Sequence, residues 1–205
     1  MCRPHRERNC DMEKTSRDKQ QIGFSKTWLF VVFVFGAAAF LVRWAGLAIP
    51  VIGPAAIDPR EVFVTLGAAS TGPVGGLVIG FFSGLPSVMK TGPATNSSLV
   101  AHVISGFLIG LLYRPLYKRW SVPALLLGWA VLVAAYYYVF LIPIFLAAAP
   151  LTYPGGLSDV FGANLRFSQA YILLVQAAFP EVVATLIVTA IILIAMPERY
   201  RRPLW

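Results

Sequence analysis

Charged side chains are scarce in this sequence and unevenly placed. Of its 205 residues, 13% are charged and 58% are hydrophobic, whereas soluble domains usually carry about 25% charged residues. The first 26 residues hold seven Lys or Arg and four Asp or Glu, while long later stretches hold almost none. This composition excludes a water-soluble fold. It predicts an all-α integral membrane protein with one membrane domain and no appended soluble domain.

Cysteine and the common catalytic motifs are also nearly absent. The two cysteines, Cys2 and Cys10, lie with His5 in the polar tail and form no metal-site pattern. The sequence has no HExxH pattern, no paired-carboxylate motif and no phosphate-binding loop. We therefore expect no enzyme, no metal site and no cofactor. The net charge of +8 comes from short basic segments beside apolar runs, which is a topology signal, so nucleic acid is not an expected partner.

Six apolar segments follow the polar tail, at residues 28–49, 61–70, 74–85, 99–113, 123–147 and 168–196. They predict a cytoplasmic polar tail over 1–26, a six-helix transmembrane domain over 27–197 and a basic cytoplasmic tail over 198–205. The second and third segments are short, and Thr71-Gly72-Pro73 separates them. We expect two short helices or one broken re-entrant pair there, with Asp58 capping the first and Pro59 at its first position.

The basic residues predict the orientation of the chain. Thirteen of the 17 Lys and Arg fall in the N-terminal tail, the 114–119 loop and the C-terminal tail. With six segments these three regions share one side, which the positive-inside rule makes cytoplasmic. We therefore expect a multi-pass protein of the plasma membrane with both termini cytoplasmic. The long loops 50–60, 86–97 and 148–167 would then face outward.

Small residues mark two predicted packing surfaces. Glycines recur at every fourth position, at Gly72, Gly76, Gly80 and Gly84, which gives a helix one smooth stripe. A bare stripe lets a neighbouring backbone approach closely, and such packing holds membrane helices together. A second set, Gly36, Ala37, Ala38 and Ala39, forms a small-residue collar in the first apolar segment.

Polar residues inside apolar segments are the candidates for a binding site. Glu181 follows Pro180 near the middle of the last segment, and intramembrane carboxylates usually face a cavity or a partner. Its role is either a ligand contact or an internal bond that locks the bundle, with Arg43 or His102 as partner. His102 is likewise a ligand contact or an interhelical hydrogen bond. The full candidate set is Arg60, Glu61, His102, Arg166, Gln169 and Glu181, with Arg60 and Glu61 also able to pair with each other.

Two stretches resemble a known transporter family. They are the run from Asp58 to Gly84, with its Gly-Pro-x-x-Gly turn into a glycine-rich helix, and the run from His102 to Arg114. Both are similar to the substrate-binding (S) components of energy-coupling factor vitamin transporters. The resemblance implies a six-helix bundle that captures a small polar micronutrient at its outer face. It also implies a separate transmembrane coupling subunit and cytoplasmic ATPases as partners.

Two other function classes remain open. The Gly-Pro-x-x-Gly helix pair also resembles the membrane input domain of some bacterial sensor kinases, which predicts a stand-alone sensor or ligand-binding domain. Such chains carry a cytoplasmic output domain, and we expect none after the last span here, which favours the transporter. A secondary transporter acting as an oligomer is the third class, although the sequence has no clear internal repeat of the kind such transporters show.

Overall fold

The computed structural model describes residues 25–50, 56–91, 96–119, 122–153, 155–197 and 204. The predicted N-terminal tail, apart from its last two residues, and the predicted C-terminal tail, apart from Leu204, lie outside this described part. So do Cys2 and Cys10.

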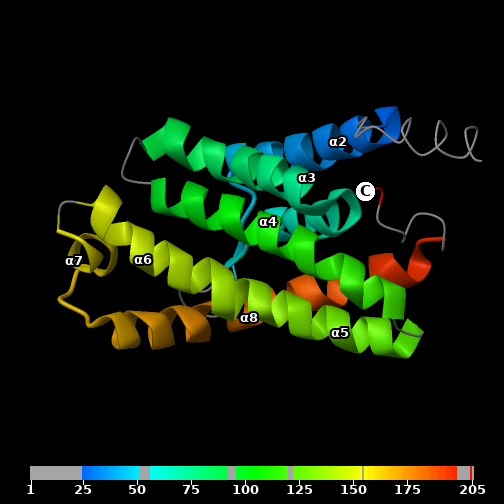
Figure 1. Cartoon of the computed structure of the whole chain (residues 1–205). Helices are drawn as coiled ribbons and strands as arrows, with labels where there is room; N and C mark the ends of the chain where they lie inside the picture. The colour runs from blue at the N-terminus through cyan, green and yellow to red at the C-terminus, as the bar shows by residue number, and fades with distance from the viewer. Residues whose placement is uncertain are drawn as a thin grey trace, which may run out of the picture.

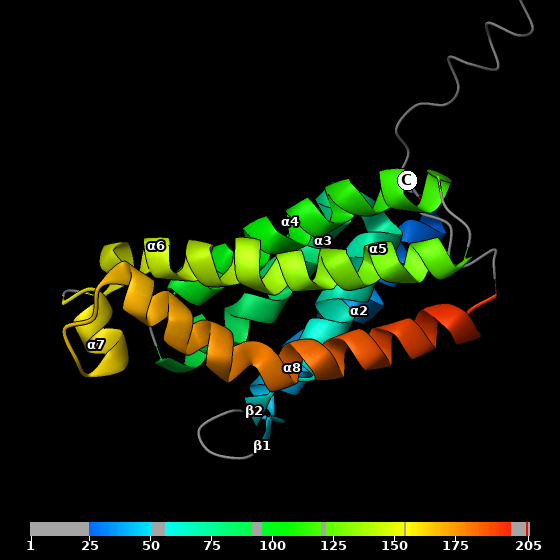
Figure 2. The same cartoon turned by 90° about the horizontal axis from the view of Figure 1, so that it is seen from below.

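The described chain forms an elongated bundle of helices (Figures 1 and 2). The long helices are α2 (Lys26–Trp44), α3 (Arg60–Thr91), α4 (Asn96–Arg119), α5 (Val122–Ala135), α6 (Ile142–Thr152) and α8 (Phe167–Ala195). A π-helical turn, η2 (Tyr136–Leu141), joins α5 to α6, and a short helix, α7 (Leu157–Phe161), precedes α8. Two short antiparallel strands, β1 (Ile49–Pro50) and β2 (Ala56–Ile57), pair Ile49 with Ile57.

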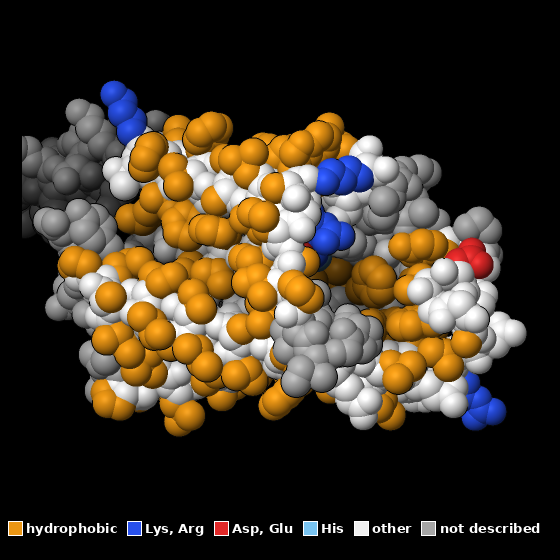
Figure 3. All heavy atoms as spheres, turned by 180° about the vertical axis from the view of Figure 1, so that it is seen from behind, with side chains coloured by type: hydrophobic (Ala, Val, Ile, Leu, Met, Phe, Trp, Pro, Cys, Tyr) orange, Lys and Arg blue, Asp and Glu red, His pale blue; other side chains and the backbone are white. Residues whose placement is uncertain are grey.

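The surface of the bundle is apolar, as the composition predicts. Phe33 and Leu127 are exposed over 72% and 67% of their area, and hydrophobic side chains cover most of the face in Figure 3. Five described helical stretches are long and apolar enough to cross a bilayer. Such a surface is stable in lipid and unfavourable in water, so the prediction of an all-α, multi-pass membrane protein is confirmed.

The predicted count of six separate helices is not confirmed, because the second and third segments belong to one helical element, α3. Within α3 the chain reverses direction at Gly72, whose backbone is not helical (φ 79°, ψ −170°). A Cβ added to Gly76 would lie 2.9 Å from the Cβ of Ala68, and the Arg60 guanidinium reaches the Ser83 carbonyl oxygen at 3.1 Å. The two arms of α3 therefore lie side by side, and the expected short pair is present as one hairpin.

The reversal leaves backbone carbonyls that no helical N–H can reach, and nearby donors bond to them. The Trp28 indole donates to the Thr71 carbonyl at 2.7 Å. The N–H of Leu204 donates to the Ser70 carbonyl at 2.9 Å. Unsatisfied backbone groups cost several kcal/mol each in lipid, so these bonds allow a break within the bundle.

Two predicted boundaries need correction. The first span was expected to reach Ile49, but α2 ends at Trp44 because Gly46 takes a left-handed conformation (φ 67°) and the chain then enters β1. The predicted loop 148–167 contains the end of α6 and the whole of α7. The last segment, predicted over 168–196, matches α8 within one residue at each end.

The glycine stripe lies against α4. A Cβ on Gly76 or Gly80 would collide with the backbone carbonyl of Gly106 or His102, and one on Gly84 would lie 2.6 Å from the Cα of Leu99. The second arm of α3 and α4 thus meet backbone to backbone. Gly36 of the α2 collar lies against the Phe82 side chain of α3, where an added Cβ would be 3.2 Å from a ring carbon.

Helix α2 begins, and α4 and α8 end, at the same end of the bundle (Figures 1 and 2). This arrangement fits the predicted grouping of the three basic regions on one side. The side of the membrane they face stays a prediction.

The contact between α3 and α4 generates a stability prediction. Gly76→Ala should lower the free energy of unfolding by about 1–3 kcal/mol, because the new methyl group meets backbone that cannot move aside. Gly36→Ala is the matched control and should stay within about 1 kcal/mol of the wild type, because a flexible phenylalanine ring can shift. Thermal unfolding in detergent measures both, and equal effects of the two changes would contradict the tight contact.

Candidate functional site

A cavity of about 580 Å³ opens between the end of α2, the start of α3, η2, α6 and α8. Strand β2 lies against α8 at this level (Figure 2). Half of the lining is polar: Arg43, Asp58, Arg60, Glu61, Tyr137 and Glu181. The other half is apolar: Ala48, Leu141, Ile142, Leu174, Ala177 and Ala178. A pocket of this size with a few convergent polar groups is typical of a small-molecule site.

The start of α3 brings three of the charged groups together. Asp58 accepts a hydrogen bond from the Arg60 N–H at 3.1 Å and so caps the helix, as predicted. Its other oxygen, Oδ2, lies 2.8 Å from Nε of Arg60, and Oε1 of Glu61 lies 3.1 Å from the same nitrogen. Arg60 is therefore held between two carboxylates, and its pairing with Glu61 is part of a larger network.

Glu61 is the centre of that network. It is 1% exposed, and side chains from three elements meet at its carboxylate. Nε2 of His102, from α4, lies 2.8 Å from Oε1, and the Tyr136 hydroxyl, from η2, donates to Oε2 at 2.5 Å. Since Arg60 also binds Ser83 of the second arm of α3, the network joins α3, α4 and η2.

The hydrogen bonds of His102 fix where its protons lie. Nδ1 is 2.6 Å from the Ser98 carbonyl oxygen, which can only accept, so Nδ1 carries a hydrogen. Nε2 faces the Glu61 carboxylate, and two lone pairs would repel each other at 2.8 Å. One proton therefore lies between His102 and Glu61, and the pair has no net charge whichever atom holds the proton.

The π-helical turn brings two consecutive tyrosines to the interior. Tyr136 and Tyr137 are 0% and 1% exposed. Their rings pack edge to face, with 5.2 Å between the ring centroids. Pro143 follows this turn and has no N–H for the carbonyl of Val139, which favours a local irregularity. Tyr136 then bonds to Glu61, and Tyr137 faces the α8 side of the cavity.

Glu181 is the least engaged carboxylate of the cavity. It accepts a hydrogen bond from the Tyr137 hydroxyl at 3.3 Å, longer than the usual 2.5–3.0 Å for such a bond. That hydroxyl also lies 3.0 Å from Thr185 of α8. Among the described residues Glu181 forms no ion pair, so the predicted pairing with Arg43 or His102 is not present.

Arg43 completes the charged wall from α2. Its Nε donates to the Ser87 hydroxyl at 3.0 Å, and its Nη1 lies 3.6 Å from Asp58 Oδ2. The side chain keeps 41% of its area exposed, against 9% for Arg60. Arg43 is thus the more accessible of the two guanidinium groups.

The structure brings some of the predicted site residues together and separates others. Arg60, Glu61 and Glu181 line the cavity, and His102 lies behind Glu61. Arg166 and Gln169 do not line it. They are exposed at the start of α8, where the Gln169 side chain accepts from the Arg166 N–H at 2.9 Å in a capping box.

Three polar lining residues were not among the predicted site residues: Arg43, Asp58 and Tyr137. Each carried a signal in the sequence. Arg43 is the one charge between Trp28 and Ile49, Asp58 stands beside Arg60 and Glu61, and Tyr137 is the middle of three tyrosines. Their meeting point depends on where α2 ends and on the π-helical turn, neither of which the apolar pattern indicates.

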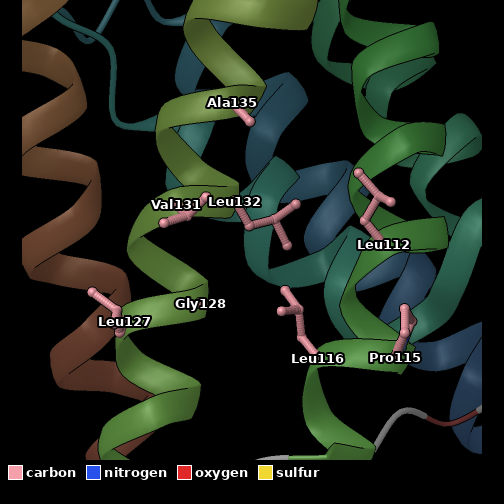
Figure 4. Close-up of a pocket in the computed structure, with 8 residues that line it drawn as sticks. All are labelled: Leu112, Pro115, Leu116, Leu127, Gly128, Val131, Leu132 and Ala135. Atoms are coloured by element: carbon pink, nitrogen blue, oxygen red, sulfur yellow. The ribbon is translucent and has the colours of Figure 1, made fainter.

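A second cavity, of about 450 Å³, lies between α4 and α5 (Figure 4). Its lining is wholly apolar, with side chains such as Leu112, Leu116 and Leu132. It offers no group that could select a polar ligand, so the charged cavity is the candidate site. In the described part of the chain, no three His, Cys, Asp or Glu side chains are placed to hold a metal ion. The arrangement is suited to binding.

The Glu61 network generates a graded stability prediction. Glu61→Gln should lower the free energy of unfolding by about 3–5 kcal/mol, because it leaves Arg60 and the shared proton of His102 without their buried carboxylate. Tyr136→Phe removes one hydrogen bond to a charged group and should cost less, about 1.5–3 kcal/mol. Arg166→Gln, at an exposed position outside the network, should change stability by less than about 0.5 kcal/mol. Denaturant unfolding in micelles gives this ranking, and a Glu61→Gln protein as stable as the Arg166→Gln protein would contradict it.

Comparison with known proteins identifies the family. The family model described as 5TMR of 5TMR-LYT matches residues 12–199, and no curated protein matches the chain. The resemblance to energy-coupling factor S components was therefore wrong, and the coupling subunit and ATPases that it implied lose their basis. Small-residue motifs carried that resemblance, and such motifs recur wherever membrane helices pack closely. Because the match covers nearly the whole chain, the protein belongs to the 5TMR of 5TMR-LYT family, a family of five-transmembrane sensor domains.

Proposed function

We propose that the chain is a membrane sensor domain that binds a small polar ligand in the charged cavity. The observation that carries this proposal is the meeting of five charged side chains at one cavity inside an otherwise apolar bundle. Charged groups at membrane depth are costly, and they usually mark a functional site. Membership in a sensor-domain family supports the same role. The role is binding and not catalysis, and we place the protein in the plasma membrane with both termini cytoplasmic.

Helix α8 is the element through which binding would be transmitted. It forms one wall of the cavity and carries Glu181, and Pro180 interrupts its hydrogen bonding next to that residue. Few of its residues are buried: Ala170, Val182, Thr185, Thr189 and Leu193. A helix with few buried contacts moves at low cost. A ligand that contacts Glu181 would therefore shift the balance between two positions of α8.

Filling the cavity tests the binding role. Ala177→Phe places a ring in the cavity, and Ala195→Phe places the same ring on an exposed position of α8 outside it. Native mass spectrometry of gently extracted protein should detect a bound small molecule on the wild type and on Ala195→Phe, and none on Ala177→Phe. Equal retention by both variants would contradict a ligand site in this cavity.

Distances between spin labels test the sensor role. In a Cys2→Ser, Cys10→Ser background, labels at Leu111 of α4 and Ile172 in the first half of α8, both exposed, report on α8. Electron–electron resonance should show a changed distance distribution when the bound molecule is removed. Labels at Leu111 and Val74, on the tightly packed α3–α4 pair, should show no change. An unchanged α4–α8 distance would leave a binding protein without a moving helix and contradict the sensor role.

A further inference from the structure

The charges around the cavity cancel, and this limits the ligand that can enter. Three cationic and three anionic groups meet there. The His102–Glu61 pair is neutral as a unit, because one proton lies between its two members. The remaining groups are Arg43 and Arg60 with Asp58 and Glu181, two of each sign when Glu181 is ionised. A cationic group of a ligand beside Glu181 favours that ionised form. A ligand with a net charge would leave one charge uncompensated, which is costly at membrane depth.

Two of these groups are available to a ligand, and they have opposite signs. Arg60 and Glu61 are 8% and 1% exposed and bind each other and several neighbours. Glu181 has one long hydrogen bond and no ion pair among the described residues. Arg43 keeps 41% of its side chain exposed, and its Nη1 is 3.6 Å from Asp58. A ligand can therefore gain a strong charge-assisted bond from a carboxylate on α8 and from a guanidinium on α2.

The rest of the cavity wall is apolar. Leu141, Ile142 and Leu174 line it together with two alanines of α8 and with Ala48, which lies between α2 and β1. The polar lining groups other than Arg43 and Glu181 already bond to protein groups. The part of the ligand that does not face Arg43 or Glu181 is thus expected to be hydrocarbon.

We propose that the ligand is a small zwitterion of the α-amino-acid type with an apolar side chain. Its ammonium group pairs with Glu181, its carboxylate pairs with Arg43, and its side chain packs against the apolar wall. This inference rests on the proposed ligand-binding function and specifies the ligand class for the same cavity.

Three molecules of one shape test the charge requirement. L-leucine is the zwitterion, isoamylamine is leucine without its carboxylate, and isocaproate is leucine without its amine. Calorimetric titration of the full chain in micelles should show that leucine binds at least about tenfold more tightly than either analogue, because each analogue lacks one charge-assisted bond. The same titration is made with isoleucine, valine, methionine and phenylalanine, since the apolar wall does not fix the side chain.

Variants test which protein side chain binds the ammonium end of the ligand and which binds its carboxylate end. Glu181→Gln should weaken leucine binding by more than about tenfold and leave isocaproate binding within about twofold. Arg43→Gln should weaken leucine and isocaproate and leave isoamylamine binding within about twofold. Arg166→Gln, the same change outside the cavity, should alter none of the three. Where a variant does not fold, the ligand series on the unaltered protein still decides the question.

The inference is overturned if either singly charged analogue binds as tightly as leucine, or if none of the five amino acids binds. Failure of this inference is separate from failure of the proposed function. A co-purified molecule that Ala177→Phe excludes would keep the cavity as a ligand site even if that molecule carried a net charge. Retention of the molecule by Ala177→Phe would contradict both the proposed ligand site and the zwitterion inference.

Discussion

The rest of the structure depends on the buried carboxylate of Glu61. Arg60 from the same helix, His102 from α4 and Tyr136 from η2 all bond to it, so one side chain of the first α3 arm fixes three elements. A buried charge is tolerated only when its hydrogen-bonding capacity is filled, and its removal leaves the partners uncompensated. The position of the cavity follows from this centre, because Glu61 and Arg60 form part of its wall.

Backbone contact provides the second constraint. The α3 hairpin and α4 approach so closely that Gly76 and Gly80 have no room for a side chain, and the carbonyls freed at Gly72 are bonded by Trp28 and Leu204. This half of the molecule is therefore a rigid frame. Helix α8 faces the frame across the charged cavity with few buried side chains of its own. One half is thus tightly packed, and the other contains a helix that can move at low cost. A sensor domain needs both, because a ligand must shift one part relative to a fixed part.

The apolar pattern predicted the membrane class, the last helix within one residue at each end, and the break at Gly72. It also indicated Glu61, His102 and Glu181 as unusual, because a charge or imidazole in an apolar run is visible without a structure. It could not place Arg166 and Gln169, which bond to each other at a helix start, or include Arg43, whose position depends on α2 ending at Trp44. In helices that are apolar on all sides, periodicity does not indicate which face points inward. The family was misassigned for a related reason, since glycine spacing reports close packing and not function.

The bond between Leu204 and the Ser70 carbonyl has a mechanical consequence. It ties the chain beyond α8 to the tip of the α3 hairpin, which belongs to the rigid frame. A helix anchored at one end and pushed near its middle swings about the anchor instead of sliding along its axis. Pro180, close to the point where the push is applied, lets the far half bend separately. In the proposed sensor, α8 would therefore pivot about its C-terminal end, while its first half, before Pro180, moves with the ligand.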